Sequence, residues 1–200
     1  MEKQRKPRVL LTGFTPFGGE RINPALEAVK RVRCPEAELR ILEVPTVFGD
    51  SARLVTAEMD AFRPDVVLCV GQAAGRSAVT PERVAINVDD ARIPDNAGQP
   101  VDAPIVPGGP AAYFATAPVK DMVRAIREAG VPSELSNSAG TYVCNHLLYQ
   151  VLHHAAPGVR AGFIHVPCIP EQTAGTDRPS LPLAQLVTAL EAAVSACCKG

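Results

Sequence analysis

The sequence lacks the features that mark nucleic-acid-binding and membrane proteins. Its 20 Lys and Arg residues are balanced by 21 Asp and Glu, which gives a net charge of −1, and no basic cluster follows the first eight residues. A nucleic-acid-binding surface needs such a cluster, so we expect no nucleic-acid partner. The apolar run at 9–11 is too short for a signal-peptide core or a membrane span, so we expect no membrane association.

Cysteine is present, but not in the patterns that bind metal. The six cysteines stand at positions 34, 69, 144, 168, 197 and 198, without a Cys-x-x-Cys pair or zinc-ligand spacing. We therefore predict no metal and no cofactor. Thiols used in this way are typical of a reducing compartment, and we expect a cytoplasmic protein.

No repeat, linker or low-complexity tract divides the 200 residues, whose 46% hydrophobic content predicts one globular domain over 1–200. The predicted strands are 8–12, 39–44, 65–70, 84–88 and 162–166; the predicted helices are 23–32, 50–62, 119–129, one from 143 onward, and 183–196. Their alternation predicts an α/β fold, a single-domain three-layer α/β/α sandwich with a mainly parallel, mixed sheet. The Pro-, Gly- and Asp-rich segment 89–110 is expected to be a functional or mobile loop.

Cys144 has the sequence context of a nucleophile. It follows the turn at Gly140, and apolar residues recur at helical spacing from Val143. A cysteine in the first turn of a helix faces unpaired N–H groups and the positive end of the helix dipole, which favour thiolate over thiol. We therefore predict that Cys144 is a nucleophile. The alternative is a small apolar residue packed at a helix start.

A nucleophilic cysteine needs a base, and the chain has only four histidines. His146 lies about 200° around the predicted helix from Cys144 and points away from it. His153 and His154 lie about 13 and 15 Å along the helix axis, beyond hydrogen-bond reach. His165 lies at the end of a predicted strand, at the sheet edge where functional groups gather. Elimination favours His165 as the base; the alternative is a structural histidine.

A third group, an acceptor that fixes the imidazole, is expected beside a Cys/His pair. The candidates are Glu82, Asp89, Asp90, Asp95 and Glu171. Their spacing does not choose among them, and the alternative for most is a solvated surface or turn carboxylate.

The glycine-containing loop 13–20 follows a predicted strand, as a phosphate-binding loop does. It lacks the second close glycine of the dinucleotide fingerprint, and Gly19-Glu20 stands where a P-loop has Lys followed by Ser or Thr. Because an acidic side chain repels phosphate, we expect no nucleotide here. Phe14 and Phe17, two of only nine aromatic residues, are candidates for the apolar wall of a small flat ligand; the alternative is that they fold back into the core.

Six blocks of sequence together resemble the pyroglutamyl peptidase type I family. They are LTGFTPFGG at 11–19, VGQAAGR at 70–76, TPERVAIN at 80–87, ARIPDN at 91–96, the segment around Cys144, and GFIHVP at 162–167. They occur in the family's order and extend over most of the chain. By this resemblance the family's nucleophile falls on Cys144, its histidine on His165 and its acid on Glu82.

The sequence departs from the family pattern at three places. Ala74 replaces an expected glycine, Cys168 stands where an aromatic residue is usual, and the stretch between Cys144 and His165 is slightly short. None of these departures touches a proposed catalytic residue.

The resemblance implies a cysteine peptidase, specifically an omega-peptidase that removes an N-terminal pyroglutamyl residue through a thioacyl intermediate. Cys144 attacks the pyroglutamyl carbonyl, and His165 protonates the departing amine and then activates water. Glu82 orients and stabilises the imidazolium. The backbone N–H of Cys144 and, by resemblance, Arg92 hold the oxyanion; the alternative for Arg92 is a salt bridge with a nearby aspartate, Asp90 or Asp95.

The resemblance also suggests a binding pocket for the lactam ring and an assembly state. Phe14 and Phe17 sandwich the ring, Tyr142 closes the slot, and Gln72 and Asn23 offer polar partners. The family further implies a homo-oligomer, a tetramer or a dimer. Two other readings remain: a non-catalytic α/β small-molecule-binding protein, or an enzyme similar to nucleoside phosphorylases.

Overall fold

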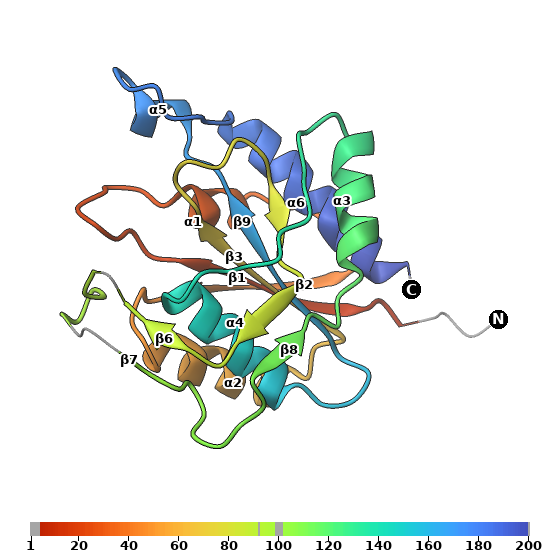
Figure 1. Cartoon of the computed structure of the whole chain (residues 1–200). Helices are drawn as coiled ribbons and strands as arrows, with labels where there is room; N and C mark the ends of the chain where they lie inside the picture. Colours follow the sequence, from red (N-terminus) through yellow and green to blue (C-terminus); the bar gives the residue numbers. More distant parts are fainter. Residues whose placement is uncertain (1–4, 92, 99–101, 200) are drawn as a thin grey trace.

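A mixed five-stranded sheet forms the centre of the protein, seen in a computed structural model that describes residues 5–91, 93–98 and 102–199 (Figure 1). The strand order is β2-β1-β3-β9-β4. The strands are β1 (Arg8–Phe14), β2 (Glu38–Val44), β3 (Val66–Gln72), β9 (Arg160–Val166) and β4 (Thr80–Pro81). The first four are parallel and β4 runs antiparallel to β9, which confirms the predicted α/β fold with a mainly parallel, mixed sheet.

Helices cover both faces of this sheet. α1 (Pro24–Val29), α3 (Val119–Glu128) and α6 (Leu183–Cys198) pack on one face, and α2 (Asp50–Phe62) and α4 (Val143–His154) pack on the other (Figure 1). The central strands are buried on both sides, so they read as continuous apolar runs rather than as an alternation. None of the helices in the described ranges has the length and hydrophobicity that a membrane span needs.

Neighbouring residues of a strand point into opposite cores. Val9 and Leu11 of β1 belong to the core under α1, α3 and α6, whereas Leu10 belongs to the core under α2 and α4. β3 divides in the same way, with Leu68 on the first side and Cys69 on the second. The period of two along a strand therefore builds both layers at once.

The small strands are where the structure differs from the sequence prediction. The predicted strand 84–88 is shorter, β5 (Val84–Ile86), and it pairs with β8 (Ala112–Phe114) outside the main sheet. The segment 89–110 contains two more short strands, β6 (Asp89–Asp90) and β7 (Asp102–Ala103), which pair with each other. A short helix, α5 (Pro170–Thr173), was also not predicted. Two- and three-residue strands carry too little periodicity to be recognised, because tertiary pairing decides them.

Helix boundaries agree closely with the sequence expectation. Asn23 caps α1, its side chain accepting a hydrogen bond from the Ala25 N–H, and Pro24 occupies the first helical position. α1 nevertheless ends at Val29 rather than near 32, although Val32 stays buried in the core. α2 runs over the predicted residues, and α4 begins at Val143, which places Cys144 in its first turn as predicted.

Candidate active site

The carboxyl edge of β3 and β9 brings Cys144 and His165 next to the same glycine. Gly71 of β3 is the register partner of His165 in β9. A Cβ added at Gly71 would lie 2.9 Å from the Cys144 Sγ and 2.8 Å from the Phe163 ring. Only glycine lets the thiol sit this close to the strand. A glycine inside a strand pattern signals such a close approach, and this signal was missed in the sequence.

His165 and Glu82 form a buried pair. The His165 Nδ1 lies 2.7 Å from the Glu82 Oε1, and the two side chains are 5% and 0% exposed. β4 places them together: Thr80 pairs with His165 across the antiparallel ladder, and Glu82 follows β4 directly. Of the five carboxylates that the sequence left open, Glu82 is the one that the described structure pairs with His165.

The charges of this pair follow from burial and hydrogen bonding. Burial lowers the pKa of His165, and the Glu82 carboxylate offsets this only in part. Burial also acts to raise the pKa of Glu82, but the hydrogen bond and charge of His165, together with Arg76, bring the net pKa below its ordinary value. An ionised Glu82 that accepts from Nδ1 leaves Nε2 of a neutral imidazole as the free, basic nitrogen.

Burial corrects one prediction about Cys144. The helix start was expected to favour the thiolate, but burial raises the pKa of this thiol to about 12, with a further upward contribution from the Glu82 charge and an opposing one from Arg76. Burial and the Glu82 charge thus act against the helix terminus, and they favour the thiol over the thiolate. The thiol therefore needs a base to become a nucleophile. Cys144 and His165 are not hydrogen-bonded to each other in the described structure, and such catalytic hydrogen bonds often form only with substrate.

The other three histidines are held elsewhere. The His146 Nδ1 lies 2.7 Å from the Asp89 Oδ2, and its Nε2 accepts a hydrogen bond from the Gly49 N–H. His153 is bonded to the hydroxyl of Tyr113, and His154 to Asp60. α4 is helical over Val143–His154, as the argument that excluded these three histidines as the base assumed.

The remaining carboxylate candidates have other surroundings. Asp89 is the partner of His146, and the buried Asp95 accepts hydrogen bonds from the backbone of Phe48 and of Ala97. Asp90 and Glu171 are exposed. Arg92, predicted to hold the oxyanion or to pair with Asp90 or Asp95, lies outside the described residues.

An aromatic cluster stands next to Cys144, and it differs from the predicted one. Phe14 ends β1 and is 2% exposed, with its ring 6.3 Å from that of Phe163, so the predicted loop position for Phe14 is wrong. Phe17 is half-buried and lies 6.5 Å from the ring of Tyr142, the N-cap of α4. Phe48, which the sequence did not single out, packs edge-on against Tyr142 at 5.4 Å.

The two predicted polar partners are engaged to different degrees. Both ends of the Asn23 amide are used, one in capping α1 and the other in a hydrogen bond to the Thr15 carbonyl. The Gln72 Nε2 donates to the Cys168 Sγ and to the Gln172 Oε1. The Gln72 Oε1 is buried and has no partner among the described residues, so it can accept a hydrogen bond from a ligand.

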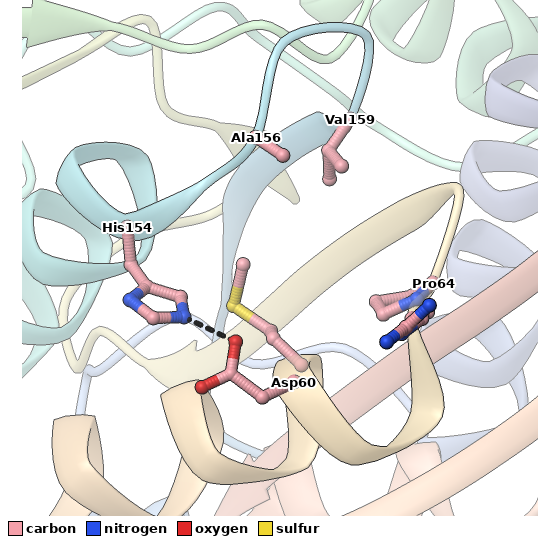
Figure 2. A pocket seen from close by; sticks show the side chains of 7 residues that line it. Asp60, Pro64, His154, Ala156 and Val159 are labelled. Carbon is pink, nitrogen blue, oxygen red and sulfur yellow. Dashed lines mark hydrogen bonds and ion pairs between the residues drawn. The ribbon is translucent and has the colours of Figure 1, made fainter.

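A separate groove lies far from this site, at the other end of α4 (Figure 2). It measures about 520 Å³ and is lined by residues from the end of α2 and from the connection between α4 and β9. His154 on its rim is ten residues beyond Cys144, or about 15 Å along the helix. In the described residues, no group of three or more His, Cys, Asp and Glu side chains is arranged to hold a metal ion.

Known proteins with similar sequences are pyrrolidone-carboxylate peptidases. The pyrrolidone-carboxylate peptidase of Levilactobacillus brevis is 58% identical over 196 residues, which cover 94% of this chain and 96% of that protein. The enzyme of that name from Vibrio vulnificus is 53% identical over 195 residues, covering 95% of this chain and 92% of its own.

Solved structures agree with these sequence relatives. The crystal structure of pyroglutamyl peptidase I from Bacillus amyloliquefaciens superposes with a TM-score of 0.92 at 48% identity, covering 97% of this chain and 98% of that one. A mutant pyrrolidone carboxyl peptidase from the hyperthermophile Pyrococcus furiosus reaches 0.91 at 41% identity, with 95% and 97% covered. The sequence model of the family described as pyroglutamyl peptidase matches residues 7–200, and this chain therefore belongs to the pyroglutamyl peptidase family.

Proposed function

We propose that this protein is a cysteine peptidase that hydrolyses the bond after an N-terminal pyroglutamyl residue. The observation that carries the proposal is the Glu82–His165 pair at the strand edge where Gly71 admits the thiol of Cys144. Membership of the pyroglutamyl peptidase family supports the same chemistry.

The proposed mechanism follows from the protonation states of the site. Because burial keeps Cys144 protonated and His165 neutral, the free Nε2 takes the thiol proton as sulfur attacks the pyroglutamyl carbonyl. Glu82 stabilises the imidazolium that forms. His165 then protonates the leaving amine, and in the second half of the cycle it activates water to cleave the thioester.

The backbone N–H of Cys144 is proposed to hold the oxyanion. Cys144 lies in the first turn of α4, where N–H groups have no partner within the helix. Arg92 remains a proposed second donor. Placing the oxyanion at a helix start also gives the helix dipole a role in the transition state, when negative charge has moved from sulfur to oxygen.

Recognition of the lactam ring is proposed to rest on Phe17, Tyr142 and Gln72. The half-buried rings provide the apolar slot, and the free Gln72 Oε1 accepts from the ring N–H. Phe14 and Asn23 support this slot from the core and from the cap of α1 rather than as its open wall. An N-terminal prolyl ring lacks the carbonyl and carries a charged ring nitrogen, which an apolar slot disfavours, so discrimination of about tenfold or more is expected.

The test is release of a fluorescent amine from pyroglutamyl-amide, with prolyl-amide as the control. We expect kcat/KM for the prolyl substrate to be at least about tenfold lower. The Phe17→Ala variant should weaken pyroglutamyl binding while Cys144 remains reactive towards alkylating reagents. Equal kcat/KM for the two amides on the unchanged protein would contradict a lactam-reading pocket.

We further propose that residues 1–200 act as one catalytic unit, located in the cytoplasm and assembled as a homodimer or homotetramer. The family match over 7–200 supports one unit, and the six free cysteines support a reducing compartment. Phe114 in β8, which is 72% exposed, supports an interface between copies. Light scattering coupled to size-exclusion chromatography measures the assembly state. A monomer at all protein concentrations would contradict the proposed oligomer.

A further inference from the structure

Arg76 has no part in the proposed chemistry, yet it reaches the acid of the catalytic group. Its Nη1 donates to the Glu82 Oε1 at 2.6 Å, the same oxygen that lies 2.7 Å from the His165 Nδ1. Glu82 is fully buried, and Arg76 is 27% exposed. One carboxylate oxygen thus serves the imidazole and the guanidinium together, and Arg76 fixes where that oxygen lies.

The same guanidinium touches two other segments of the site. Its Nη1 also donates to the Thr80 hydroxyl, and Thr80 is the residue of β4 that pairs with His165. Its Nη2 donates to the Ser138 carbonyl at 3.1 Å. Ser138 stands in the loop that leads into α4, six residues before Cys144. A planar guanidinium has donors fixed in a fork, so it can hold these three acceptors at once.

We propose that Arg76 is a positioning residue of the active site, which locks Glu82 against His165 and ties both to the loop leading into Cys144. The inference rests on the proposed peptidase function. It adds a residue that acts through the acid and the nucleophile loop, without contact with substrate.

The positive charge of Arg76 also affects the pKa values of Cys144 and His165. Among the described residues, the titratable and charged groups that face the Cys144 thiol and the His165 imidazole are Glu82, Arg76, the Cys69 thiol and Tyr142 at the α4 N-cap. The Glu82 charge raises the pKa of both Cys144 and His165, whereas the Arg76 charge lowers both. Removing the positive charge therefore moves both pKa values upward, and the whole pH profile of the enzyme should move to higher pH.

Three variants distinguish the effect of the hydrogen bonds of Arg76 from the effect of its charge. Arg76→Met removes the charge and the fork, Arg76→Lys keeps the charge and loses the fork, and Arg124→Met removes an exposed ion pair with Asp121 as the matched control. Each is measured by kcat and KM for pyroglutamyl-amide against pH. The rate of iodoacetamide alkylation at Cys144 against pH, without substrate, gives a readout independent of turnover.

We expect Arg76→Met to lose about 10- to 100-fold in kcat with KM changed by less than about threefold, and both limbs of its pH profile to move up by about one unit. The pH dependence of alkylation should move with them. Arg76→Lys should keep the limbs in place and lose about three- to tenfold in kcat, because an ammonium cannot reproduce the fork. Arg124→Met should match the unchanged protein.

Two results overturn the proposal. One is Arg76→Met with unchanged kcat and unchanged limbs, and the other is a loss of kcat without movement of the limbs or of alkylation, which a merely structural role would give. If Arg76→Met does not fold, Arg76→Gln, which also removes the charge, replaces it: reduced kcat with both limbs moved to higher pH supports the proposal, and unchanged kcat or fixed limbs refutes it. An unchanged protein that fails to hydrolyse pyroglutamyl-amide refutes the proposed function instead, and the alkylation profiles still test Arg76.

Discussion

Two buried histidine–carboxylate pairs lie near the start of α4, and their difference separates a structural histidine from a candidate base. In both, Nδ1 lies 2.7 Å from a carboxylate oxygen, that of Asp89 for His146 and of Glu82 for His165. The His146 Nε2 is already occupied by the Gly49 N–H. The His165 Nε2 has no hydrogen-bond partner in the described ranges.

Pairing with a carboxylate is therefore not what marks a catalytic histidine. Both carboxylates fix a tautomer with the proton on Nδ1, so both imidazoles carry a lone pair on Nε2. In His146, that lone pair accepts a hydrogen bond from the Gly49 N–H and so ties the start of α2 to α4, which is a structural role. The His165 Nε2 has no such partner in the described part of the chain, and His165 is paired in the sheet with Gly71, against which the Cys144 thiol packs.

The largest expected effect comes from removing each of the two imidazoles in turn. His165→Ala should lose about 1,000-fold or more in kcat/KM, because it removes the base and acid of the reaction. His146→Ala should retain kcat within about threefold but lose about 1–3 kcal/mol of stability, since Asp89 and Gly49 are left unpaired. Kinetics on folded protein and urea unfolding measure the two effects; equal loss of kcat in both variants, with both folded, would refute the distinction.

The second comparison is between the carboxylates. Glu82→Gln should lower kcat by about 100- to 10,000-fold, because an amide neither stabilises the imidazolium nor enforces the required tautomer. Asp89→Asn should mainly lower the unfolding midpoint, with kcat nearly unchanged. Comparable kcat values for the two variants would mean that Glu82 does not serve the reaction.

Sequence reasoning reached Cys144 and His165 because helical period and strand ends are local signals. The same period excluded His146, and α4 does begin where the apolar pattern starts. Glu82 was selected only by resemblance, since β4 is two residues long and its pairing with β9 is a tertiary event.

Burial accounts for what the sequence could not predict. The helix start argued for a thiolate at Cys144, but partial burial of this residue beside β3 raises the pKa of the thiol. Arg76 lies within a block that was recognised, yet only the fold brings its guanidinium to Glu82 and to Ser138. Phe14 was assigned to a loop because β1 continues two residues further than its apolar run suggests.

A smaller effect is expected from crowding the thiol. Gly71→Ala places a methyl group 2.9 Å from the Cys144 Sγ and should lower kcat by about 10- to 100-fold. Gly162→Ala makes an equally tight contact, 2.9 Å from the Ala117 side chain, on a part of β9 away from the site. It should cost about 1–3 kcal/mol of stability and leave the kcat of the folded enzyme unchanged. A Gly71→Ala enzyme with full kcat would place the reacting sulfur elsewhere.

The smallest expected effect is on pH dependence. Burial holds the pKa of His165 below its ordinary value of 6.5, so the free enzyme keeps its base at mildly acidic pH and kcat/KM should fall only below pH 6.5. Between the folded pKa and 6.5 the unfolded chain binds a proton that the folded site does not, so stability decreases as pH drops through that window. A pH–rate profile whose acid limb lies above 6.5 would contradict the buried, neutral imidazole.

Identifying the acylated residue tests the central claim most directly. The protein is mixed with a pyroglutamyl ester, quenched in acid within the first turnovers, digested and analysed by mass spectrometry. The account predicts a pyroglutamyl thioester on the peptide that contains Cys144, absent from Cys144→Ser and absent from the peptides of Cys69 and Cys168. Turnover that continues in Cys144→Ser, or an adduct on any other residue, would contradict it.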